Sequence, residues 1–211
     1  KVKPTMMCVV PRFLQKVYAG VLEKSEESSS LKKKIFNWAI KIGKQTAEFK
    51  RVGLEPPFTL KSKEFFADLL VFSKIKEKLG GRLWFIPCGG AAISTEVTQF
   101  FESVNIHITV GYGLTETTAT LTALPLKNFI HGSCGKTLPG VEIKIGENEE
   151  ILAKGNGLMN GYYKRSEDTS EVFTEDGWFK TGDAGRIDEN GNLFITDRIK
   201  DLMKTSNGKY I

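Results

Sequence analysis

A short β-branched run that glycines interrupt constrains the fold of this chain more than any other feature. Residues 108–110 are apolar and β-branched, which is typical of a buried strand, and the glycines that follow break the strand sharply. Tyr112, Thr115 and Glu116 come directly at this break. Because ligands of open α/β sheets bind at the carboxyl ends of the strands, the pattern predicts a binding site here.

Tyr112, Thr115 and Glu116 carry the groups that a nucleotide–metal site needs. An aromatic ring can stack on a base, a hydroxyl can reach a phosphate oxygen, and a single carboxylate suits a Mg²⁺ ion that keeps most of its waters. A simpler interpretation also stays open. The strand can run into a helix whose N-cap is Thr115, with Glu116 near the positive helix end.

A second glycine-containing loop precedes this strand. Residues 83–86 predict a strand that opens into the small residues Gly89, Gly90 and Ala91, and Ser94 then caps a predicted helix that carries apolar residues to position 104. The order strand–loop–helix–strand is a βαβ unit, so we expect both loops at the same sheet edge. Small residues let a flat ligand approach the backbone closely, although a tight turn also explains a glycine pair.

The first 80 residues predict three helices. Apolar spacing indicates helices over residues 11–24, 31–50 and 65–79, with Pro11 at the first start and Gly80 and Gly81 after the last end. A strand over residues 6–10 precedes them. The second helix has lysines opposite its apolar face, so it either packs on the core or rests on an anionic membrane; packing is favoured because the apolar face has no bulky excess.

From residue 132 onward the pattern changes to short alternating strands separated by turns. Residues 186–188 and 193–195 flank Glu189-Asn190-Gly191, which is a strong hairpin signal. We expect a small β-barrel or meander appended to the α/β layer. Asp183 follows Thr181-Gly182, and this glycine-flanked position predicts a loop.

The composition and net charge of the chain limit the kinds of ligand and partner that it can bind. The 211 residues include 30 Lys+Arg and 25 Asp+Glu, a net charge of +5. This mild excess suits anionic ligands or a phospholipid surface and is too scattered to favour nucleic acid. The three cysteines are widely spaced and form no C-x-x-C, which argues against a disulfide framework or a zinc site and favours a reducing compartment. No signal peptide and no apolar run near the ~18 residues of a spanning helix is present, so we expect a soluble or peripherally attached protein.

Four motifs in order resemble the adenylate-forming (AMP-forming) acyl-CoA synthetase superfamily, most of all the long-chain fatty acid–CoA ligases. The resemblance covers nearly the whole chain. The motifs are Tyr112-Gly113-Leu114-Thr115-Glu116, Gly135-Lys136-Thr137-Leu138-Pro139-Gly140, Trp178-Phe179-Lys180-Thr181-Gly182-Asp183 and Asp197-Arg198-Ile199-Lys200.

The resemblance implies an α/β fold, a sheet layered with helices and followed by a small β-rich subdomain, within the large N-terminal domain of such a ligase. Residues 1–131 would be the α/β part of the AMP-binding domain and residues 132–199 the β-barrel subdomain of the same domain. Residues 200–211 would be the hinge and the start of a C-terminal domain. The chain would then be a central piece of a longer enzyme, without a Gly/Ser/Thr-rich phosphate loop or a C-terminal catalytic lysine.

The resemblance also assigns roles to residues. Tyr112 and Gly113, together with Gly89, Gly90 and Ala91, would bind the adenine end of ATP, and Asp183 and Arg198 would contact the ribose. Thr115 would bind the α-phosphate, Glu116 would hold Mg²⁺, and Lys200 would be the pivot of the C-terminal domain. Thr115 and Glu116 are thus the catalytic candidates.

The implied reaction activates a fatty acid with ATP as an acyl-adenylate, releases pyrophosphate, and transfers the acyl group to CoA. Two alternatives stay open: an adenylation domain that loads a carrier protein, and a non-catalytic module that binds anions or membranes through the basic helices. The implied location is cytoplasmic, with peripheral contact at the inner face of the membrane left open, as is the oligomeric state.

Overall fold

A computed structural model describes residues 2–118 and 120–199 of the chain. The chain divides into two compact units. Unit 1 comprises residues 1–110 and 125–132, and unit 2 comprises residues 111–124 and 133–211. Within the described residues, no helix is long and apolar enough to cross a membrane.

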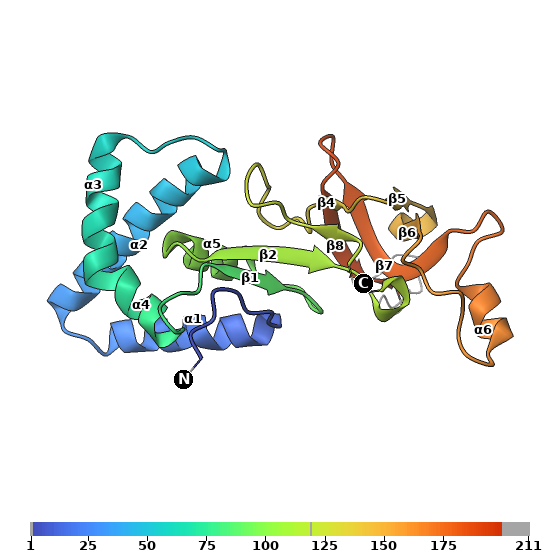
Figure 1. The fold of residues 1–211 in the computed structure, drawn as a ribbon, viewed down its shortest axis with the longest axis horizontal. Helices are drawn as coiled ribbons and strands as arrows, with labels where there is room; N and C mark the ends of the chain where they lie inside the picture. The colour runs from blue at the N-terminus through green and yellow to red at the C-terminus, as the bar shows by residue number, and fades with distance from the viewer. Residues whose placement is uncertain (1, 119, 200–211) are drawn as a thin grey trace, which may run out of the picture. The chain divides into compact units, whose positions relative to one another are not determined.

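Unit 1 is a parallel strand pair covered by helices (Figure 1). Strand β1 pairs in parallel with β2, with Cys88 opposite Val110, and helix α5 connects them, which confirms the predicted βαβ unit. Ser94 caps α5 by accepting a hydrogen bond from the Val97 amide at 3.4 Å, as predicted. The elements of this part are α1 (Pro11–Glu26), α2 (Ser30–Arg51), α3 (Phe58–Ala67), α4 (Ser73–Lys78), β1 (Phe85–Cys88), α5 (Thr95–Ser103) and β2 (His107–Tyr112).

Two predictions for unit 1 were wrong in detail. The segment expected as a strand over residues 6–10 forms only two isolated bridges, from Met6 to Phe85 and from Val9 to Cys88. It forms no continuous ladder with any of the described strands. The helix expected over residues 65–79 starts earlier and is interrupted by a π-helical turn, Asp68–Phe72, between α3 and α4. Apolar spacing locates a helix face but does not reveal a change of helical pitch.

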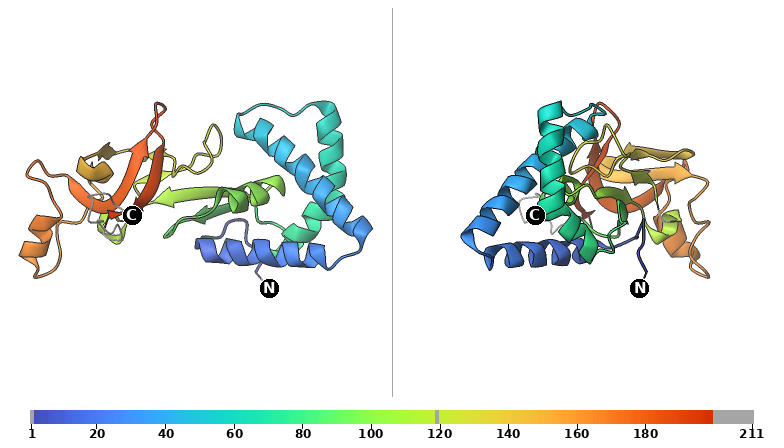
Figure 2. Two further views of the ribbon diagram at one scale, coloured as in Figure 1. Left: turned by 180° about the vertical axis from the view of Figure 1, so that it is seen from behind. Right: turned by 60° about the vertical axis from the view of Figure 1, so that its left-hand side comes forward.

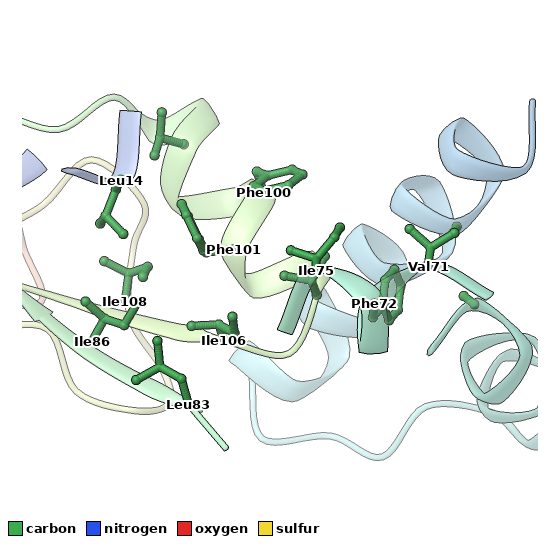
Figure 3. Close-up of a cluster of buried hydrophobic side chains, with 14 of the residues drawn as sticks. Leu14, Val71, Phe72, Ile75, Leu83, Ile86, Phe100, Phe101, Ile106 and Ile108 are labelled. Carbon is green, nitrogen blue, oxygen red and sulfur yellow. The ribbon is translucent and has the colours of Figure 1, made fainter. Parts of the chain in front are cut away.

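The core of unit 1 lies between the strand pair and the helices (Figure 3). Ile86 and Ile108 come from the two strands, and Phe101 of α5 packs with them; all three are fully buried. Gly43 of α2 allows the close approach of α5, because a Cβ there would lie 1.9 Å from the Ser103 carbonyl oxygen. Helix α2 buries Ala39 and Ile42, so its apolar face packs on the protein, which favours the packing interpretation of this basic helix.

Unit 2 is built on a curled antiparallel sheet, seen from further directions in Figure 2. The predicted hairpin is confirmed: β7 and β8 are antiparallel and the turn closes with the Gly191 amide donating to the Asp188 carbonyl at 3.0 Å. The last two residues of β2 pair with β3, and β3 pairs with β4. The elements are β3 (Thr122–Ala123), β4 (Lys136–Thr137), β5 (Val141–Ile145), β6 (Glu150–Gly155), α6 (Ser166–Glu171), β7 (Phe179–Ile187) and β8 (Leu193–Arg198).

Unit 2 has a smaller core of its own. Tyr112 packs there with four other buried residues: Leu121, Ile151, Ala153 and Leu193. The tyrosine at the end of β2 is therefore anchored by the β-rich part of the chain. This anchor fixes the start of the glycine-containing loop in which Thr115 and Glu116 lie.

Candidate functional site

Asp183 lies inside strand β7, so the prediction of a glycine-flanked loop was wrong. It pairs with Arg198 of β8, and the neighbouring Ala184 pairs with Glu150 of β6. Gly182 takes a positive φ of 72° at an irregular part of the ladder, and its amide donates to the Glu150 carboxylate at 3.0 Å. Glycine and aspartate are poor strand formers, but neighbouring strands on both sides override that local preference.

The Asp183 carboxylate has a donor on each oxygen. The Tyr112 hydroxyl donates to Oδ2 at 2.8 Å, and the Arg198 Nε–H donates to Oδ1 at 3.0 Å. The Asp183 side chain is only 9% exposed, whereas that of Arg198 is 61% exposed. A carboxylate has about four lone-pair sites, so two are left for hydroxyl donors of a ligand. The carboxylate is thus held in one orientation before any ligand arrives.

The sequence did not reveal the contact between the Tyr112 hydroxyl and Asp183. The Tyr112 side chain is buried, and burial raises the pKa of the hydroxyl well above its usual range, with the neighbouring Asp183 charge acting in the same direction. The hydroxyl therefore stays protonated and serves as a donor to Asp183. The role of the ring in base binding stays a prediction.

The loop after β2 forms a one-turn 3₁₀ helix, Thr115–Thr117, and not the start of an α-helix. Leu114, and not Thr115, occupies the N-cap position; its amide donates to Thr117 Oγ1 at 2.9 Å. The simpler interpretation of Thr115 as the cap of a helix therefore does not hold. Thr115 is exposed, Gly113 and Glu116 are half-buried, and Thr117 is buried.

Glu116 is held by a segment that sequence reasoning missed. The Tyr162 hydroxyl donates to Glu116 Oε1 at 3.0 Å, and the Met159 amide donates to the Glu116 carbonyl at 2.7 Å. Tyr162 is itself fixed, because its amide donates to Thr169 Oγ1 at 2.9 Å. Burial and the bond to Glu116 raise the pKa of Tyr162. The hydrogen bond joins residues that are 46 positions apart in the sequence. The one sequence signal for this segment is the glycine that precedes the tyrosine pair at residues 162–163.

The residues around Glu116 fit a Mg²⁺ ion bound mostly by phosphates and water. Among the described residues, no group of three or more His, Cys, Asp or Glu side chains could hold a metal ion. Glu116 offers one carboxylate whose Oε1 is already oriented by Tyr162. Magnesium is commonly held by one or two carboxylates and substrate phosphates, and a dedicated protein cage is not needed.

The predicted residues of the first glycine-containing loop belong to the other unit of the chain. Gly89, Gly90 and Ala91 belong to unit 1 and directly follow β1, and Gly90 has a positive φ of 82° that suits a turn. Lys200, the predicted hinge, lies outside the described residues. The structure therefore brings together Tyr112, Asp183 and Arg198, and separately Glu116 and Tyr162, within unit 2.

Comparison with known proteins identifies the family. A sequence profile described as AMP-binding enzyme matches residues 1–163. The chain is 37% identical to long chain acyl-CoA synthetase 4 of Arabidopsis thaliana over 100% of this chain and 33% of that protein. It is 34% identical to the long-chain-fatty-acid–CoA ligase FadD15 of Mycobacterium bovis over 99% of this chain and 34% of that protein. The chain belongs to the AMP-binding enzyme family, as its four motifs predicted, and it spans about a third of the length of the relatives it matches.

Solved structures agree with the α/β fold class. A Mycobacterium tuberculosis fatty acyl CoA synthetase superposes with a TM-score of 0.53 at 29% identity, covering 62% of this chain and 28% of that one. The O-succinylbenzoate Coenzyme A synthetase from Bacillus subtilis, in complex with ATP and magnesium ion, gives a TM-score of 0.62 at 23% identity, covering 99% of this chain and 34% of that one. At 23% identity, the second similarity shows a shared fold and no more.

Proposed function

We propose that this chain supplies the nucleoside-recognising part of an AMP-forming long-chain fatty acid–CoA ligase. The observation that carries the proposal is the Asp183 carboxylate, buried and oriented by Tyr112 and Arg198 beside the strand that ends in the Y-G-x-T-E motif. The relatives at 34–37% identity are named as long-chain acyl-CoA synthetases or ligases, which supports the acid class.

In the proposed reaction, one carboxylate oxygen of the fatty acid attacks the α-phosphorus of ATP. The bond from that phosphorus to the bridging oxygen of pyrophosphate breaks, and pyrophosphate leaves with the electron pair. The CoA thiolate then attacks the acyl carbon of the mixed anhydride and AMP leaves. Such transfers require little covalent work from the protein, so positioning and charge neutralisation dominate.

The residues of this chain divide that work. Asp183 would accept hydrogen bonds from the vicinal ribose hydroxyls, and Arg198 would both orient Asp183 and contact the sugar. Thr115, exposed in the 3₁₀ turn, would donate to the α-phosphate. The binding of adenine would fall to Tyr112 and Gly113, together with Gly89, Gly90 and Ala91.

Glu116 would bind Mg²⁺, and Tyr162 would hold the carboxylate for that task. The ion, when bound with ATP, supplies positive charge that offsets the negative charge on the phosphates. The fixed Tyr162 hydroxyl limits the rotation of the Glu116 carboxylate, so less conformational entropy is lost on binding.

The finer assignments belong to the same proposal. Residues 1–131 and 132–199 would be two parts of one AMP-binding domain, and residues 200–211, with Lys200, would begin the hinge. We infer a cytoplasmic enzyme; peripheral membrane contact is an open alternative. An acyl-CoA ligase and a domain that loads a carrier protein differ in the molecule that accepts the acyl group.

The test is ATP–pyrophosphate exchange in an enzyme that spans the full length of the relatives. We expect exchange that depends on palmitate and Mg²⁺, followed by acyl-CoA formation when CoA is added. The 211-residue chain alone should bind AMP weakly and show no turnover. An ATP–pyrophosphate exchange rate that does not depend on long-chain acids would contradict the substrate assignment. Acyl transfer to a carrier protein and not to CoA would also contradict it.

A further inference from the structure

Strand β7 carries a bulge at the position of Asp183. Between two pairs of the β6–β7 ladder, Leu152–Lys180 and Glu150–Ala184, β6 contributes one residue and β7 contributes three. Extra residues on one strand of an antiparallel pair interrupt the ladder and change the direction of a side chain, and such bulges are common beside functional sites. The bulge therefore bears directly on how the Asp183 carboxylate is aimed.

The bulge breaks the alternation of side chains along β7. In a regular strand, successive side chains point to opposite faces of the sheet. Asp183 and Ala184 are consecutive, yet both are buried. Gly182 takes the positive φ of 72°, which a glycine adopts without steric cost. The bulge thus accounts for a carboxylate that lies buried beside the Tyr112 hydroxyl.

Two side chains bond to the backbone of the bulge. The Thr181 hydroxyl donates to the Ile151 carbonyl at 2.8 Å and accepts from the Asp183 amide at 3.2 Å. The Gly182 amide donates to Glu150 Oε1 at 3.0 Å. Because backbone amides away from water need a partner, these side chains stabilise one conformation of the bulge.

Glu150 holds the strand at two points, one on each side of Asp183. Its backbone lies opposite Ala184 in the ladder, and its side chain reaches back to the amide of Gly182. The second contact is a charge-assisted hydrogen bond, since a carboxylate accepts from a backbone amide. Glu150 therefore limits the movement of the backbone from which the Asp183 side chain projects.

We propose that Glu150 is a positioning residue, which holds the β7 bulge so that the Asp183 carboxylate can accept hydrogen bonds from the ribose hydroxyls of a nucleotide. Glu150 itself touches no part of the nucleotide and acts through Asp183. This role rests on the proposed function, because it takes Asp183 as the ribose-binding group. Glu150 lies on β6, outside the four sequence motifs.

The contact with Gly182 requires an acceptor of the right length more than it requires a charge. Glutamine offers an amide oxygen at the same reach, whereas alanine has no acceptor and aspartate is shorter by one methylene. Substitutions of Glu150 can therefore separate the loss of this hydrogen bond from the loss of a negative charge.

The test is isothermal titration of the chain with AMP and with 2′,3′-dideoxy-AMP, which lacks both ribose hydroxyls. Glu150→Ala should weaken AMP binding about fivefold or more and leave binding of the dideoxy analogue unchanged, because only the hydroxyls require an oriented Asp183. Glu150→Gln should bind AMP as the wild type does. Glu142→Ala, at an exposed position of β5, is the matched control for the loss of one charge.

Hydrogen exchange gives a second measurement that needs no nucleotide. Exchange of the Gly182 amide, followed by NMR, should be about fivefold or more faster in Glu150→Ala than in the wild type and unchanged in Glu150→Gln. Circular dichroism and a melting curve check the fold of each variant. If Glu150→Ala does not fold, Glu150→Asp replaces it and should show the same pattern, since its charge remains and its reach is shorter.

Three results would overturn this role of Glu150. They are unchanged AMP affinity in a folded Glu150→Ala variant, an equal loss of affinity for AMP and for the dideoxy analogue, and a Glu150→Gln variant as impaired as Glu150→Ala. In each case the wild type still binds AMP, so the proposed function stands. Absence of AMP binding to the wild type would instead contradict the proposed function, and the role of Glu150 with it.

Discussion

Asp183 in unit 2 and Glu102 in unit 1 are both buried acidic side chains, yet their surroundings are opposite. Asp183 has a donor on each oxygen, from Tyr112 and Arg198. Among the described residues, one Glu102 oxygen has a 3.5 Å contact to His131 and the other has no hydrogen-bond partner, and burial raises the pKa of Glu102 to about 8. Burial alone therefore does not decide what a carboxyl group does; the donors around it do.

The comparison separates a carboxylate whose oxygens are oriented by two donors from a carboxyl group that burial favours in its neutral form. Asp183 is oriented as an acceptor with free lone pairs, which matches the hydroxyls of a sugar. Glu102 keeps its proton near neutral pH because burial raises its pKa to about 8. The two carboxyl groups should thus respond oppositely to loss of charge, and the predictions below examine this difference.

The largest effect is expected at Glu116, a third carboxyl group, which is half-buried and which we propose binds Mg²⁺. In the full-length enzyme, Glu116→Gln should lower ATP–pyrophosphate exchange about 100-fold or more, because the substitution removes a metal-binding charge and preserves the shape. Exposed Glu142→Gln on β5 is the matched control. Equal exchange rates at saturating Mg²⁺ would remove Glu116 from the metal-binding role.

Tyr112→Phe tests the donor that sets Asp183 apart. Removing the hydroxyl leaves a buried charged oxygen with one donor fewer, so the free energy of unfolding should fall by about 1.5–3 kcal/mol. Urea denaturation measures the loss. In a double-mutant cycle with Asp183→Asn the two effects should not add, and additive effects would show that the pair does not act together.

Tyr162→Phe should have a smaller, more specific effect. Loss of its bond to Glu116 should raise the Mg²⁺ concentration needed for half-maximal exchange by about threefold to tenfold. Neighbouring Tyr163, 86% exposed, provides the control Tyr163→Phe. If both variants require the same Mg²⁺ concentration, Tyr162 does not position Glu116.

The last effect appears only at alkaline pH and concerns the stability contribution of Glu102. Its pKa rises from 4.5 to about 8 on folding, so between these pH values the folded state keeps a proton that the unfolded state loses. Stability from this group is therefore full below pH 4.5 and falls as the pH rises toward 8. Glu102→Gln should melt a few degrees above the wild type at pH 9 and close to it at pH 5; a melting temperature below the wild type at pH 9 would contradict the assignment.

The sequence predicted those features that depend on local chemistry. The Glu189-Asn190-Gly191 segment predicted the β7–β8 hairpin because glycine suits the positive-φ position of a tight turn, and Gly191 takes a φ of 79° there. Ser94 predicted the start of α5. The four motifs predicted the family because their order and spacing are specific. Their assigned roles stay predictions that the variants above can test.

The sequence could not predict features that depend on distant contacts. Asp183 reads as a turn residue and becomes part of a strand because β6 and β8 pair on either side. The contact between Glu116 and Tyr162 joins residues 46 positions apart. Glu102 lies on α5 and contacts His131 of a distant loop, and no sequence periodicity predicts that contact. Burial of Glu102 follows from packing, since its helical position alone gives no sign of it.

The central claim is that the oriented Asp183 carboxylate recognises the sugar of a nucleotide. Titrating AMP calorimetrically into the wild-type chain and into Asp183→Ala tests it most directly. We expect weak saturable binding to the wild type and a loss of about 2–3 kcal/mol of binding free energy in the variant, the value of charge-assisted bonds to two hydroxyls. Unchanged AMP affinity in a folded Asp183→Ala variant would contradict the claim.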